Sequence, residues 1–191
     1  MTPFEYVSVL ISIILGLGIT QIVTGIADVI QNWRHSRLYL PHTLWVLFVF
    51  FLHVQEWWVL YEMRTLTEWK LPIFLFAILY PIGLFVLARL LFLSPALNQP
   101  VIFKEFYYAN YLKFFGTAII LIAISILDNV LINGYPIGDQ IVQLILLALL
   151  LSLIYIKPSH EWVHVALAVG LLLLLLVSMA VADWTIGTNS G

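Results

Sequence analysis

Cysteine is absent from this sequence, and charged residues are scarce. Without cysteine the chain can form no disulfide, no thiolate metal ligand and no cysteine nucleophile, which excludes several enzyme classes. Only 9% of its 191 residues are charged, against about a quarter in soluble domains. The net charge is −2 and the eight Lys and Arg residues are scattered, so we exclude DNA and RNA as main partners.

Apolar residues are in excess, at 63% of the chain. They fall into runs of about twenty residues, long enough to cross a bilayer as α-helices. Proline stands near the start of five runs, where its missing N–H costs nothing: Pro3, Pro41, Pro72, Pro136 and Pro158. The sequence therefore predicts an all-α integral membrane protein, a single domain over residues 1–186 with about six transmembrane helices. We expect these helices at residues 4–30, 41–63, 71–93, 111–133, 137–156 and 159–183.

Three local features refine this expectation. Pro81 stands in the middle of the third run and predicts a kink there. The stretch from 94 to 110 combines aromatic residues with Lys104, which is typical of a segment in the lipid headgroup layer. Residues 187–191 have the composition of a flexible linker and are left out of the fold.

The distribution of Lys and Arg predicts the orientation in the membrane. An external N-terminus puts six of them near the cytoplasmic face: Arg34, Arg37, Arg89, Lys104, Lys113 and Lys157. Only Arg64 and Lys70 then lie outside. We therefore expect a multi-pass protein of the plasma (inner) membrane with both termini outside. Its external mouth is expected to be acidic, from Asp128 beside Asn129 and from Asp183.

The first predicted helix carries a row of small and polar residues at four-residue spacing: Ser8, Ser12, Gly16, Thr20, Thr24 and Asp28. Such a row is typical of a helix-packing seam, and we assign Ser8, Ser12, Gly16 and Thr20 to one. The alternative is a water-filled path within one bundle or around an oligomer axis. In that interpretation Thr24 and Asp28, with the neighbouring Gln21, replace the hydration of an ion.

Ionisable residues in the next two predicted helices are further candidates for such a path. His53 and Glu56 stand one turn apart near the bilayer centre, where ionisable groups are costly and usually functional. A hydrogen bond between them is expected if they act as a proton-exchanging pair; the alternative is a structural contact between helices. Arg89 either extends to the cytoplasmic surface or pairs with Asp28 close to Gln21.

The segment His160-Glu161-Trp162-Val163-His164 matches H-E-x-x-H, in which two histidines bind zinc and the glutamate is a general base. Over these five positions it resembles the catalytic helix of membrane-embedded site-2-type metalloproteases. That resemblance implies an aspartate as third ligand, but Leu127-Asp128-Asn129 falls at the opposite membrane face. Only His42 and Asp28 are expected at a suitable depth. The alternatives are an interfacial helix start without metal, or a haem held between His42 and His164.

These patterns leave three hypotheses of function. The first, which we expect, is an oligomeric channel or transporter for an ion or small solute, a homo-oligomer in the lipid bilayer without catalytic residues or cofactor. The second is an intramembrane zinc-dependent enzyme that uses His160, Glu161 and His164. The third is a scaffold or partner subunit, in which every polar row is a docking seam.

Overall fold

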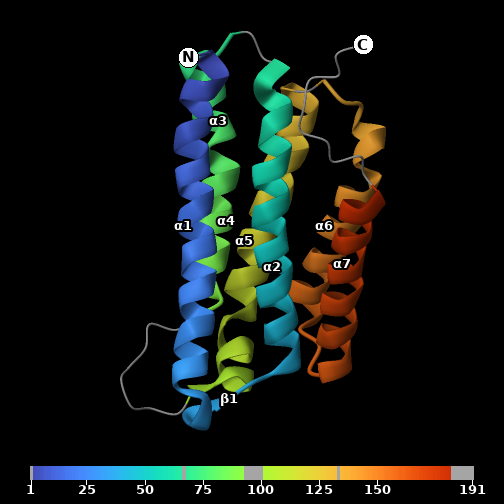
Figure 1. Ribbon diagram of the computed structural model, residues 1–191. Coiled ribbons are helices and arrows are strands. Elements are labelled where there is room, and N and C mark those ends of the chain that lie inside the picture. The colour runs from blue at the N-terminus through green and yellow to red at the C-terminus, as the bar shows by residue number, and fades with distance from the viewer. Residues whose placement is uncertain (1, 66–67, 93–100, 133, 182–191) are drawn as a thin grey trace.

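The fold is a bundle of α-helices, seen in a computed structural model that describes residues 2–65, 68–92, 101–132 and 134–181 (Figure 1). Within these residues, six helical stretches are long and apolar enough to cross a membrane. They are Pro3–Gln31, Leu40–Thr65, Leu71–Leu90, Phe103–Leu131, Ile137–Ile156 and Glu161–Val181. Their number agrees with the number of spans that the sequence predicts.

The first two spans begin where proline and a capping residue favour a helix. In α1 (Pro3–Gln31) the Thr2 hydroxyl accepts from the backbone N–H of Glu5 at 3.2 Å, and the Glu5 carboxylate accepts from Thr2 N at 2.8 Å. This reciprocal capping box satisfies two N–H groups that the first turn leaves free. The second span consists of α2 (Leu40–Val59) followed by the 3₁₀ turn η2 (Leu60–Thr65).

The third span is interrupted in its middle. It consists of α3 (Leu71–Ala77) and α4 (Leu79–Leu90), separated at Ile78. Pro81 explains the break, because it has no N–H to donate to the carbonyl oxygen of Ala77 and its ring crowds that oxygen. The helical ladder resumes at once, with Ile82 N donating to Ile78 O at 3.1 Å. The kink predicted at Pro81 is therefore present as a break between two helices.

The fourth span, α5 (Phe103–Leu131), begins eight residues before the predicted start at 111. Aromatic residues together with Lys104 made this part of the sequence typical of an interfacial segment, yet it forms the first two turns of the helix. At about 1.5 Å per residue the 29-residue helix is longer than the hydrocarbon core of a bilayer is thick. A short parallel bridge, β1 (Ser36–Arg37) with β2 (Val101–Ile102), joins the chain after α1 to the chain before α5.

The last two spans are α6 (Ile141–Ile156), preceded by the 3₁₀ turn η3 (Ile137–Gln140), and α7 (Glu161–Val181). In the bundle α2 has a central place, with contacts to α1, α4, α5 and α7 (Figure 1). Helix α4 also packs against α1 and α5, and α6 lies against α5. We call the end of the bundle at which α1 begins the N-terminal end and the other the opposite end.

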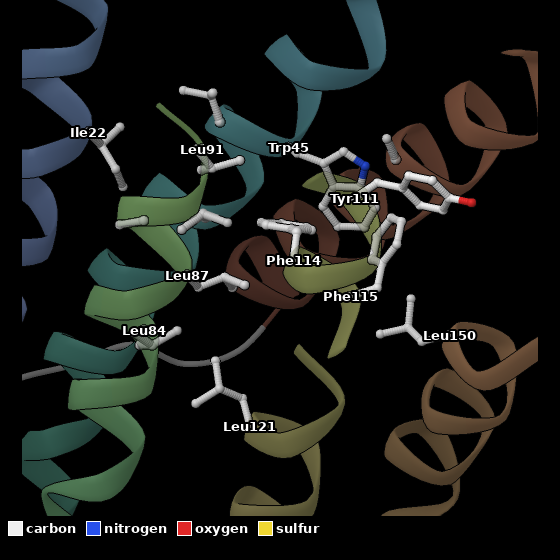
Figure 2. Packing of buried hydrophobic residues seen from close by; sticks show 14 of the residues in the cluster. Ile22, Trp45, Leu84, Leu87, Leu91, Tyr111, Phe114, Phe115, Leu121 and Leu150 are labelled. Carbon is white, nitrogen blue, oxygen red and sulfur yellow. The ribbon is translucent and has the colours of Figure 1, made fainter. Parts of the chain in front are cut away.

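Aromatic and aliphatic side chains fill the space between α2, α4 and α5 (Figure 2). The indole of Trp45 meets the rings of Phe114 and Phe115 edge to face, with centroids 5.3 and 5.2 Å apart. Phe115 and, on α4, Leu84 are fully buried. Edge-to-face pairs of this kind add to the free energy that burial of the rings supplies.

Glycine allows three close contacts between helices. A Cβ atom at Gly18 would overlap the His53 ring, one at Gly25 would overlap Phe92, and one at Gly83 would overlap Leu121. The contact at Gly18 brings α1 onto α2, and His53 is fully buried there. By contrast, a Cβ at Gly16, half a turn away on α1, would meet nothing within 4 Å.

This contrast gives a matched pair of variants. Gly18→Ala should lower the free energy of unfolding by about 1–3 kcal/mol, because the added methyl displaces a ring fixed in the core. Gly16→Ala should leave it unchanged or raise it by about 0.5–1 kcal/mol, since alanine is the better helix former. Thermal unfolding of the purified variants in detergent measures both effects. Equal stabilities of the two variants would contradict the contact between Gly18 and His53.

Candidate functional site

The polar row of α1 lies outside the packing face that this helix presents to its own bundle. The buried face consists of Val7, Ile11, Leu15, Gly18, Ile22 and Gly25. Gly16, Thr20 and Thr24 are exposed, whereas Ser8 and Ser12 are partly buried. The Thr20 hydroxyl donates to the Gly16 carbonyl at 2.8 Å, which satisfies it within the helix. The row is therefore not the seam within the subunit, and a seam between subunits stays a prediction.

His53 and Glu56 do not form the hydrogen-bonded pair that their spacing suggested. His53 Nδ1 donates to the carbonyl oxygen of Val49 at 2.7 Å, and Nε2 has no hydrogen-bond partner among the described residues. The His53 ring faces α1, where it packs on Gly18. Glu56 lines a cavity on another side of α2. His53 and Glu56, one turn apart on α2, therefore lie in different environments.

Arg89 is exposed on α4, and its guanidinium donates to Gln21 Oε1 on α1 at 3.1 Å. This contact joins two of the residues proposed for a polar path. Thr24 is exposed and Asp28 partly buried, one and two turns further along α1. These residues belong to the half of the bundle nearer the opposite end. They therefore lie in another part of the bundle than the cavity that Glu56 lines, and their role in a polar path stays a prediction.

A cavity of about 390 Å³ opens at the N-terminal end of the bundle. Its walls come from the last turn of α2, η2, the break between α3 and α4, and the last turns of α5. Three carboxyl groups line it: Glu56, Glu62 and Asp128. None of the described residues that line it is Lys, Arg or His. The cavity is therefore acidic, as the sequence predicted for this end from Asp128; Asp183 lies outside the described residues.

Glu56 is partly buried where it lines this cavity. Within the described part of the chain its contacts are electrostatic, with the Asp128 carboxyl group and the Tyr80 ring, and no hydrogen bond holds it. A carboxylate in such surroundings is costly unless a proton or a cation accompanies it. Because of its surroundings and the nearby Asp128 carboxyl group, the Glu56 side chain is stabilised when it binds a proton or another cation.

Amide side chains fix the α5 wall of the cavity. Asn129 Nδ2 donates to Gln140 Oε1 at 2.7 Å, and Gln143 Nε2 donates to Ser125 Oγ at 3.1 Å. Gln140 is buried although it belongs to the short turn η3. Sequence reasoning missed both glutamines. Their three-residue spacing in an apolar run, which places them on one helical face, was the available signal.

The H-E-x-x-H segment is occupied by contacts within the protein. His164 is fully buried, and its Nε2 donates to the carbonyl oxygen of Pro158 at 3.0 Å. Since Nε2 carries the proton, Nδ1 accepts from the Tyr107 hydroxyl at 2.9 Å. Glu161 forms an ion pair with Lys104 at 2.9 Å. Both ring nitrogens of His164 and the carboxylate of Glu161 are thus engaged.

The remaining metal candidates do not join His164. His160 is exposed, and the Nε2 atom of His42 donates to the carbonyl oxygen of Leu91 at 2.7 Å. In the described ranges, no three His, Asp or Glu residues come together as a group that could hold a metal ion. The structure therefore does not assemble His42, His160 and His164 into the zinc or haem site considered from the sequence.

Tyrosines surround His164 on the α5 side. The rings of Tyr107, Tyr108 and Tyr111 each lie edge-on to the imidazole, at 5.4 to 5.5 Å between centroids. Tyr39, just before α2, shares a hydrogen bond of 3.2 Å with the Tyr108 hydroxyl. Burial, and then this hydrogen bond, raise the pKa of Tyr39 above its usual range. The cluster is a neutral aromatic layer that fixes α7 at the opposite end.

No family model matches this chain, and no match was found among curated proteins or solved structures. Its function is therefore argued from the geometry of its own residues. Of the polar regions described, the acidic cavity combines volume, charge and an interrupted helix, whereas Glu161 and His164 of the H-E-x-x-H segment are engaged by contacts within the protein.

The different surroundings of the two histidines in this segment can be tested. His164→Ala should lower the free energy of unfolding by about 1–3 kcal/mol, because it leaves a buried tyrosine hydroxyl and a carbonyl oxygen without a partner. His160→Ala should have little effect, since His160 is exposed. A chelator should not change the melting temperature of the unmodified protein. Stoichiometric zinc that is lost in both variants would instead favour a metal site.

Proposed function

We propose that this protein is a membrane transporter that takes up a cation or a cationic small solute through the acidic cavity at its N-terminal end. The observation that carries the proposal is the place of Glu56. It lies deep in a cavity beside a second carboxyl group, and next to the break between α3 and α4. By the distribution of Lys and Arg, this end faces the outside of the cell.

The charge of the cavity supports a cationic substrate. Glu56, Glu62 and Asp128 contribute negative charge, and the described lining has no basic residue to compensate it. The nearby Arg64 is engaged elsewhere, because its guanidinium donates to the Tyr61 carbonyl at 3.1 Å and lies 4.0 Å from the centre of that ring. A concave acidic surface concentrates cations and repels anions.

The interrupted helix supports transport rather than simple binding. Ala77 and Tyr80 both line the cavity. The carbonyl oxygen of Ala77 has no helical N–H donor, because the residue four positions later is Pro81. In many transporters, substrate sites lie at such breaks, where freed backbone groups coordinate the substrate and the half-helices can move. Here the break between α3 and α4 likewise lies beside the acidic cavity, which is the proposed substrate site.

The filled core supports a carrier rather than an open pore through one subunit. Beyond the cavity, the space between α2, α4 and α5 is occupied by buried side chains such as Leu84, Trp45 and Phe115 (Figure 2). An ion cannot cross this layer without a rearrangement of the helices. Movement of α3 against α4 at Ile78 is the rearrangement that the break allows.

Reconstitution tests this function. In liposomes of phosphatidylcholine and phosphatidylglycerol, the protein should accelerate the flux of at least one of three probes: sodium, potassium or radiolabelled methylammonium. Glu56→Gln should reduce that flux by about tenfold or more, since a loss of 1.4 kcal/mol of binding gives this factor. The exposed Glu68 at the same end is outside the cavity lining, so Glu68→Gln is the matched control.

The possible results separate clearly. Flux that disappears in Glu56→Gln but persists in Glu68→Gln supports the proposal, provided that both variants unfold at the temperature of the unmodified protein. Flux that is equal in all three proteins contradicts the role of Glu56. Absence of flux for every probe, in correctly folded protein, overturns the transport function.

A further inference from the structure

We infer that the acidic cavity takes an organic ammonium ion with an apolar or aromatic part, rather than a bare metal ion. This inference rests on the proposed function, because it names the substrate class of the same cavity. Its basis is the combination of cavity volume, an acidic lining, aromatic walls and oriented hydrogen-bond acceptors.

The geometry is unfavourable for a metal ion. Three carboxyl groups line the cavity, yet no three acidic or histidine side chains in the described ranges come close enough to share an ion. Calcium and magnesium require six or more oxygen ligands at about 2.0–2.6 Å, which means a compact cage. A space of about 390 Å³ instead falls in the usual range for organic ligands, about 300–1,000 Å³.

The position of Glu56 is a separate indication that positive charge belongs in the cavity. Its carboxyl group lies deep in the protein, lines the cavity and has no hydrogen-bond donor among the described residues. Asp128 adds a like charge nearby. A carboxylate in a largely enclosed cavity without donor or counter-ion is unfavourable, and a ligand ammonium group supplies both a donor and the opposite charge.

The other walls are suited to the apolar part of such a ligand. Phe76 and Tyr80 line the cavity from the interrupted helix, Met63 from η2, and Tyr135 from the segment after α5. Aromatic faces attract ammonium groups by the cation–π interaction, and they also shield the attached carbon chain from water. A hydrated sodium or potassium ion gains nothing from Met63 and Phe76.

The α5 wall favours a ligand that donates hydrogen bonds. Asn129 uses its NH₂ group to donate to Gln140, which leaves its carbonyl oxygen as an acceptor for a ligand. Ser125 already accepts from Gln143. With the carboxylates and the freed carbonyl of Ala77, acceptors predominate in the cavity. A primary or secondary ammonium, which has N–H groups to donate, matches them better than a quaternary one.

Calorimetry on the purified full-length protein in lipid nanodiscs tests this inference, with phenethylammonium as the probe. Two compounds are matched controls: 2-phenylethanol has a similar shape without the charge, and sodium has the charge without the ring. Phenethylammonium should bind at least about tenfold more tightly than either control. Glu56→Gln and Tyr80→Leu should each weaken its binding by about tenfold, while Glu68→Gln should not.

A second measurement avoids dependence on variants that fail to fold. A hydrophobic carbodiimide reacts with buried carboxyl groups, so Glu56 of the unmodified protein should be labelled, and mass spectrometry locates the adduct. Phenethylammonium should slow this labelling by about tenfold at saturation, whereas 2-phenylethanol should not.

The results also separate this inference from the proposed function. Binding of sodium or zinc that depends on Glu56, without binding of phenethylammonium, overturns the inference and leaves transport of a cation standing. Binding of phenethylammonium without flux of phenethylammonium or of any other probe into liposomes supports the inference and overturns the transport function. Equal binding of phenethylammonium and 2-phenylethanol overturns the inference, because the carboxyl groups then contribute nothing to recognition.

Discussion

A chain segment that crosses a bilayer finds no water to pair with its backbone N–H and C=O groups, and six helical stretches among the described residues are long and apolar enough to be subject to this constraint. Five of the six spans meet it with helical hydrogen bonds that continue through α-helix or into a short 3₁₀ turn. The third span does not, because Pro81 withholds a donor from Ala77. The interruption borders the acidic cavity, which Ala77 and Tyr80 line. The interrupted stretch of backbone thus lies beside the three carboxyl groups that line the cavity.

Histidines away from the cavity illustrate the same constraint at the level of side chains. His42 and His53, both on α2, donate to backbone carbonyl oxygens at 2.7 Å. His164 does so at 3.0 Å and uses its second nitrogen for Tyr107. Each imidazole is buried and joins parts of the fold, as the contact of His42 with Leu91 does for α2 and the end of α4. These three histidines are therefore buried packing residues that also form hydrogen bonds within the protein.

The two sides of α2 differ in how closely they are packed. Towards α1, Gly18 allows the His53 ring to fill the space between the helices completely, which fixes that pair. Towards α3 and α5, Glu56 faces a cavity whose wall includes the break in the third span. Packed interfaces have one preferred arrangement, whereas an interrupted helix beside a cavity can adopt more than one. This asymmetry is the physical basis on which we propose that a cation is taken up from the N-terminal end.

Local properties of the sequence determined the number of spans, because hydropathy over twenty residues and proline at the first turn do not depend on the rest of the chain. They also indicated the break at Pro81 and the acidity contributed by Asp128. Only tertiary structure decided which face of each helix packs against its neighbours. Gly16 and Gly18 are equally small, yet one is exposed and the other lies against His53, and Glu56 interacts with Asp128 of a distant span rather than with its own neighbour. Such choices depend on how helices rotate and pack against one another, and a single sequence leaves that rotation open because many faces of these helices are equally apolar.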